Sequence, residues 1–179
     1  MNQFILVLNG PICSGKSTVV DLLLARHEKL FLASYDTIKW LVSNYSSDKH
    51  LAVVTDIVLP LAESAFDKGF SIVADAVTLK TTRERFAELA QRKGVKFIEV
   101  NLEAPLPALE ERFKKRVEDS IRMGTKISIT DMQGMMKIFT RYQENKNFNA
   151  PTFDSSILSA ERIAAEIENL INLNVYVKS

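Results

Sequence analysis

The stretch GPICSGKST, residues 10–18, follows the apolar run FILVL (residues 4–8) and precedes a segment with helical spacing. Two glycines with four residues between them, followed by Lys16 and Ser17, have the spacing of a phosphate-binding P-loop. Such glycines let consecutive backbone N–H groups point inward at phosphate oxygens, and the helix that follows adds the positive end of its dipole. This stretch therefore predicts a phosphate-binding loop between a buried strand and a helix.

Each part of this loop has an expected task. Lys16 places a cation on the β and γ phosphates, and Ser17 offers a hydroxyl to Mg²⁺, which bridges the same phosphates. A glycine-rich turn that matches by chance is the alternative, and the flanking strand and helix argue against it. The side chain of Cys13 is expected to point away from the phosphates, with a redox role for its thiol as the weaker alternative. The expected nucleotide-binding residues of the loop are Gly10, Pro11, Ile12, Cys13, Ser14, Gly15, Lys16, Ser17 and Thr18.

Short apolar runs alternate with segments of helical spacing along the chain. The runs predict strands at Phe4–Leu8, Leu30–Ser34, Phe70–Ala74, Val95–Leu102 and, from a weaker pattern, Ser155–Leu158. The helical segments are Thr18–Arg26, Thr37–Tyr45, Leu51–Lys68, Thr81–Lys93, Leu106–Val117 or slightly beyond, Asp131–Gln143 and Ala160–Leu170. The alternation predicts an α/β fold with a mostly parallel five-stranded sheet and right-handed crossovers.

Length and composition narrow the class of protein. A chain of 179 residues with 46% hydrophobic residues suits a single folded domain spanning residues 1–179. A net charge of +1 supplies no overall field for a polyanion, and one cysteine cannot form an internal disulfide, which suits a reducing compartment. The N-terminus lacks a basic region and its apolar run is too short for a signal or a membrane span. We therefore expect a cytoplasmic protein without a membrane partner.

Two aspartates follow predicted strands at the sheet edge that also carries the loop. Asp36 comes after the second strand and is a candidate general base, and Asp75 ends the third strand and is a candidate metal-side acid together with Ser17. Local alternatives exist for both, because Asp36 could be the N-cap of the following helix and Asp75 could cap a turn.

Two arginines lie four residues apart on the helix after the fourth strand. Arg112 and Arg116 therefore share one helix face, and the polar segment 118–130 separates this helix from the next. A solvated basic face is one interpretation. The other is a lid at about residues 112–130 whose arginines close over bound phosphates.

Other P-loop classes fit less well. A switch GTPase needs an N-K-x-D after a strand, and residues 145–148 read NKNF instead. An AAA-type motor needs adjacent acids after an apolar strand and usually a longer chain, whereas IVADA (residues 72–76) has one acid. A small kinase needs a carboxylate near the acceptor, a metal-side acid and mobile arginines, and the chain has a candidate for each.

The segments GPICSGKST, IVADAV and LEERFKKR, with that around Asp36, resemble the small P-loop kinases that include polynucleotide 5′-hydroxyl kinases, zeta-toxin-like kinases and chloramphenicol phosphotransferases. The resemblance implies a three-layer α/β/α sandwich, sheet order 2-3-1-4-5 and a helical lid. It also implies Mg²⁺ and ATP as cofactors, Asp36 as proton acceptor, and Arg112 and Arg116 on the nucleotide, with Arg116 stabilising the transferring phosphoryl group.

The acceptor remains open between classes. Lys39 stands where a polynucleotide kinase would have an arginine, and lysine cannot make the same bidentate phosphate contact, so a small hydroxyl acceptor is favoured over a nucleic acid. A regulator that binds or hydrolyses ATP without being a kinase is a further alternative. Trp40 and Tyr45 could stack on an acceptor ring or pack in the core. A closed apolar pocket beside Trp40 would favour a small acceptor, and a basic cleft past Asp36 would favour a polynucleotide.

Overall fold

The computed structural model describes residues 2–75 and 79–173, and its centre is a five-stranded sheet. The strands are β1 (Phe4–Asn9), β2 (Leu30–Ser34), β3 (Ser71–Asp75), β4 (Lys96–Glu103) and β5 (Thr152–Asp154). The helices are α1 (Lys16–Arg26), α2 (Tyr35–Lys39), α3 (Ser47–Asp67), α4 (Lys80–Lys93), α5 (Leu106–Met123), α6 (Met132–Asn145) and α7 (Ala160–Asn172). Every strand pair is parallel, and the order β2-β3-β1-β4-β5 confirms the predicted order.

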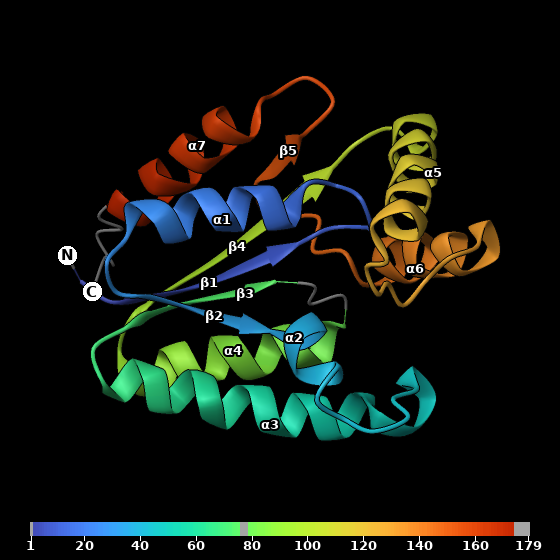
Figure 1. Cartoon of the computed structure of the whole chain (residues 1–179). Helices are drawn as coiled ribbons and strands as arrows, with labels where there is room; N and C mark the ends of the chain where they lie inside the picture. Colours follow the sequence, from blue (N-terminus) through green and yellow to red (C-terminus); the bar gives the residue numbers. More distant parts are fainter. Residues whose placement is uncertain (1, 76–78, 174–179) are drawn as a thin grey trace.

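Alternating side chains of the central strand build two cores, one on each face of the sheet. Ile5 and Val7 pack in the core under α3 and α4, where Val58 and Phe86 also lie. The neighbouring residues of β1 face α1 and α7 on the other side. Figure 1 shows this three-layer arrangement, with α1 and α7 above the sheet and α3 and α4 below it. The predicted three-layer α/β/α sandwich is therefore confirmed.

A helical cap, which we define as α5, residues 124–131 and α6, lies beyond the carboxyl ends of the strands (Figure 1). Leu109 and Phe113 of α5 and Met135 of α6 form a small core of their own. Ile12 and Cys13 of the glycine-rich loop pack against this core. The cap is thus built directly onto the loop that the sequence assigned to phosphate binding.

The last strand lies elsewhere than predicted. It spans Thr152–Asp154, and residues 155–158 form a turn, in which Ile157 is 80% exposed. The Asp154 carboxylate accepts hydrogen bonds from the backbone and hydroxyl of Ser156, at 2.7 and 2.6 Å, which turns the chain away from the sheet. The prediction of a strand at Ser155–Leu158 was therefore wrong, and the last strand lies just before these residues.

Three helices also differ from their predicted ranges by more than two residues at one end. Helix α2 begins earlier and is shorter, because Ser34 caps it and the chain leaves the helix after Lys39. Helix α3 begins at Ser47 instead of Leu51. Helix α5 continues to Met123 and ends at Gly124 with φ +65°, so the first part of the polar segment 118–130 is helical. None of the helices in the described parts of the chain is long and apolar enough to cross a membrane.

Candidate active site

The backbone of residues 10–17 turns sharply between β1 and α1, and two glycines make this possible. Gly10 has φ +154°, and a Cβ on it would lie 2.2 Å from the carbonyl oxygen of Leu102 on β4. Gly15 has φ +90° and begins α1 in the left-handed region. A residue with a side chain would be strained at either position, so both glycines of the predicted loop are needed for its shape.

The Lys16 ammonium is held inside this loop. Its Nζ donates to the carbonyl oxygens of Gly10 at 2.9 Å and Pro11 at 2.7 Å. Burial lowers the pKa of Lys16 to about 8, although the carboxylates of Asp75 and Asp36 act in the opposite direction. The loop thus holds an ammonium group whose protonation depends on the charges that bind beside it.

Asp75 lies at the carboxyl end of β3, level with Ser34 on β2. Its side chain is buried, and Oδ1 has no hydrogen-bond partner among the described residues. Burial raises the pKa of Asp75, and the nearby Asp36 carboxylate raises it further. A buried carboxylate oxygen without a donor suits a hard cation, with the Ser17 hydroxyl as a second oxygen ligand. No group of three or more histidine, cysteine or acidic side chains within residues 2–75 and 79–173 could hold a metal by itself.

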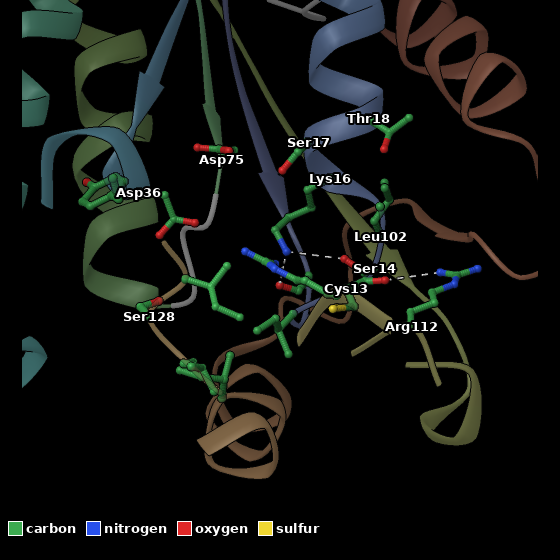
Figure 2. A pocket seen from close by; sticks show the side chains of 18 of the residues that line it. Cys13, Ser14, Lys16, Ser17, Thr18, Asp36, Asp75, Leu102, Arg112 and Ser128 are labelled. Carbon is green, nitrogen blue, oxygen red and sulfur yellow. Dashed lines mark hydrogen bonds between the residues drawn. The ribbon is translucent and has the colours of Figure 1, made fainter. Parts of the chain in front are cut away.

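Asp36 lies in the first turn of α2, and the structure removes its alternative role as N-cap. Ser34 is the N-cap, because its hydroxyl accepts from the backbone N–H of Thr37 at 3.2 Å. The Asp36 carboxylate is 56% exposed and accepts from Lys39 Nζ at 2.5 Å. Figure 2 shows Asp36 on the side of Lys16 opposite to Arg112. The Asp36 carboxylate therefore does not cap the helix, and it lines the cavity.

Arg112 of α5 fastens the cap to the loop. Its guanidinium donates to the hydroxyl and carbonyl oxygens of Ser155, at 2.9 and 2.8 Å, and to the carbonyl of Cys13 at 3.3 Å. Arg116, one turn later, is exposed at the cavity, and its positive charge lowers the pKa of Lys16. The two predicted arginines thus differ: Arg112 connects three segments, whereas Arg116, which lies near Lys16, has no ion pair within residues 2–75 and 79–173.

A cavity of about 1040 Å³ is lined by both glycines of the loop, Lys16, Ser17, the two aspartates and the two arginines. Beyond Asp36 its wall includes the aromatic side chains of Tyr35, Trp40 and Tyr45. Cap residues complete the wall, and their apolar members are Ile127, Ile129 and Ile138. Tyr45 packs partly against the core, whereas Trp40 is 37% exposed at the cavity.

The cap touches α2 at this end of the cavity. Lys126 Nζ lies 4.5 Å from the centre of the Trp40 ring, and Lys39 Nζ lies 5.1 Å from it. Lys39 also donates to the Ser128 hydroxyl at 3.1 Å. These contacts bridge the cap and α2 beside Trp40.

Two basic residues of α6 were not identified as site residues from the sequence. Lys137 and Arg141 of α6 line the cavity with Lys126 and Ser128. The spacing of four between Lys137 and Arg141 indicates a shared helix face, but nothing local indicates where that face points. The basic residues of α5 divide in the structure, since Lys114, Lys115 and Arg122 lie in an outer depression away from Lys16.

A family model described as an AAA domain, AAA_33, matches residues 5–140. The chain belongs to this family. The match includes the P-loop, Asp36, Asp75, Arg112 and Arg116, and the predicted resemblance to small P-loop kinases is confirmed. A match to this family does not make the chain an AAA-type motor, and we keep the prediction from the sequence that it is not one.

Solved structures share the fold at low sequence identity. The Mycobacterium tuberculosis APS kinase CysC in complex with AMPPNP and APS has a TM-score of 0.68 at 20% identity, covering 96% of this chain and 98% of that chain. The Deinococcus radiodurans tunicamycin resistance protein has a TM-score of 0.63 at 16% identity, covering 96% and 97%. A chain of the Pnkp1/Rnl/Hen1 RNA repair complex has a TM-score of 0.61 at 16% identity, covering 79% of this chain and 44% of that chain. No curated protein matches the sequence. The family and these neighbours support a kinase-like, nucleotide-binding P-loop protein.

Proposed function

We propose that this protein is an ATP- and Mg²⁺-dependent kinase that transfers the γ-phosphate to a hydroxyl group of a small molecule. One observation carries the proposal: a single cavity contains the P-loop lysine, Lys16, and an exposed carboxylate, Asp36, whose side chain has no capping role. In this proposal residues 1–179 form one kinase domain, and the helical cap is its lid.

The P-loop supplies the phosphate site. Its backbone N–H groups and the N-terminus of α1 bind the phosphates, and Lys16 exchanges the carbonyls of Gly10 and Pro11 for phosphate oxygens. Arg112 holds the loop against the Ser155 turn at the nucleotide side, and Arg116 reaches the transferring group as its charge spreads. Ser17 and Asp75 would hold Mg²⁺, which neutralises phosphate charge as the transferred group loosens.

Asp36 acts on the acceptor. It orients the hydroxyl and takes its proton while the hydroxyl oxygen forms a bond to the γ-phosphorus. The bond from that phosphorus to the β–γ bridging oxygen breaks, and its electron pair stays on the ADP that leaves. Lys39, bonded to the same carboxylate, fixes its direction.

The shape of the cavity supports a small acceptor. Cap residues 126–129 meet α2 through the Lys39–Ser128 hydrogen bond and the stacking of Lys126 on Trp40. A strand of nucleic acid needs an open channel past Asp36, whereas these two contacts bridge the cap and α2 on that side of the cavity. The polynucleotide alternative rests on the fold shared with the RNA repair complex chain and on the basic cap residues.

A transfer screen tests the proposal. Labelled ATP and Mg²⁺ are incubated with the wild-type protein and with Asp36→Asn against sugars, nucleosides, antibiotics and 5′-hydroxyl oligonucleotides. Label should appear on one class of small molecule with the wild-type protein and fall by at least about 10²-fold with the variant. ATP hydrolysis without transfer to any acceptor would favour the regulator, and transfer only to oligonucleotides would favour the polynucleotide kinase.

A further inference from the structure

The cavity has a large excess of positive charge. Seven lysine and arginine side chains and two carboxylates line it. The carboxylates are Asp36 and Asp75, and Asp36 already pairs with Lys39. Clefts lined by one sign of charge attract ligands of the other sign.

The positive residues fall into two groups by position. The P-loop side has Lys16, Arg112 and Arg116, which line the part of the cavity where the proposed ATP phosphates would bind. The second group, Lys126, Lys137 and Arg141, comes from residues 124–131 and α6. Among the described residues, none of this second group has a carboxylate within 4.0 Å.

Two members of this second group lie near the aromatic side chains beside Asp36. Lys126 stacks on Trp40, which neighbours Lys39 and Asp36. Arg141 is close enough to Tyr45 that its charge opposes the effect of burial on the pKa of that phenol. Lys126 and Arg141 therefore lie at the Trp40 and Tyr45 end of the cavity, and Lys137 lines the same cavity one helical turn before Arg141.

We propose that the acceptor is a small hydroxyl compound that already carries a phosphate group, and that Arg141, with Lys126 and Lys137, binds that group. A guanidinium can donate two parallel hydrogen bonds to a phosphate, and the two ammonium groups add point charges beside it. This inference rests on the proposed kinase function, because it names the acceptor class of the same site.

The test uses inorganic phosphate as the probe and Trp40 as the reporter. Trp40 is the only tryptophan in the chain, so its fluorescence reports on the acceptor side without added label. The P-loop is first saturated with AMPPNP and Mg²⁺, and phosphate is then titrated. We expect a saturable change in fluorescence that Arg141→Gln weakens by at least about 10-fold, as expected for loss of a charge-assisted bond.

Two further variants make the result interpretable. Lys137→Gln should weaken phosphate binding in the same direction, and it serves if Arg141→Gln unfolds. Arg85→Gln is the matched control, because Arg85 pairs with Asp56 on the surface, outside the cavity lining, and should leave phosphate binding unchanged. A wild-type protein without saturable binding, or variants of Arg141 and Lys137 that bind phosphate like wild type, would overturn the inference.

A second measurement separates this inference from the kinase proposal itself. Phosphate binding in the AMPPNP complex requires no turnover, so it can succeed while transfer fails, and transfer to uncharged acceptors can succeed while phosphate binding fails. In the transfer screen, sugar phosphates and nucleoside monophosphates should be phosphorylated in preference to the matching sugars and nucleosides. Preference for the uncharged partners, or displacement of phosphate only by oligonucleotides, contradicts a small phosphorylated acceptor.

Discussion

The Lys39 ammonium lies 2.5 Å from the Asp36 carboxylate and 3.1 Å from the Ser128 hydroxyl, so a single side chain joins the candidate base on α2 to the cap. The Lys39 side chain is 12% exposed, and its partial burial makes such a charged contact stronger than one on an open surface. In a kinase, closing of the cap and orientation of the base would therefore be connected through Lys39.

Lys39→Met tests this connection. The variant keeps the aliphatic length but removes the ammonium, and we expect kcat/KM for the acceptor to fall by about 10- to 100-fold while Mg·ATP affinity stays near wild type. Ser128→Ala removes only the contact with the cap and should have a smaller effect on steady-state kinetics. Equal losses in the two variants would place the effect in cap docking alone.

Asp36→Asn separates catalysis from folding. Since Ser34 is the N-cap of α2, the Asn variant should melt at the wild-type temperature and bind Mg·ATP normally, yet lose at least about 10²-fold in transfer. Ser34→Ala is the matched variant, and it should cost about 1 kcal/mol of stability through loss of the cap. If Asp36→Asn instead lowers thermal stability and retains specific activity, the base lies elsewhere.

The lowered pKa of Lys16 predicts a pH dependence of nucleotide binding. Above about 8 the free protein loses this charge, so binding of a phosphate requires a proton, and ATP affinity should fall as pH rises from 7 to 9. Calorimetry in buffers of different ionisation enthalpy should show proton uptake near pH 8. Lys16→Ala should bind ATP weakly at every pH, keep its fold and lose productive turnover.

The same shift has a stability consequence with a definite sign. Between about pH 8 and 10.5 the unfolded chain holds a proton on Lys16 that the folded chain has lost, so this group makes the free energy of unfolding rise with pH in that window. Denaturant titrations of the wild-type protein at pH 7.5 and 9.5 should show this rise relative to Lys16→Ala. An identical pH slope in the two proteins contradicts the assignment.

Arg116→Ala should lower turnover more than ATP binding. Its guanidinium is near Lys16 and carries no ion pair among the described residues, so it is available to contact the transferring phosphoryl group most strongly in the transition state. Arg122→Ala is the control on the same helix, because Arg122 pairs with Asp119 on the outer depression. Similar kinetics for both variants would mean that Arg116 only belongs to a solvated basic face of α5.

The sequence by itself determined the sheet and the phosphate-binding loop. Buried parallel strands are continuous apolar runs, and a P-loop is a contiguous stretch whose backbone shape follows from its own glycines. Asp36 and Asp75 could be placed beside the loop for the same reason, since the carboxyl ends of parallel strands share one edge. Local pattern failed for the last strand, because the turn made by Asp154 and Ser156 overrides an apolar run that only resembles a strand.

Only the tertiary structure decided what else faces the cavity. Serine and aspartate are both common N-cap residues, so the sequence does not decide between Ser34 and Asp36. The hydrogen bond from the Thr37 N–H to the Ser34 hydroxyl makes Ser34 the N-cap of α2. Arg141 reaches the cavity near Tyr45 from α6, which follows α2 far along the chain, and the helical spacing of α6 does not indicate this neighbour. The direction of the cap is set by packing of Leu109, Phe113 and Met135 against the P-loop. Such contacts form between segments that are far apart in the sequence, and the hydrophobic pattern within one segment does not indicate them.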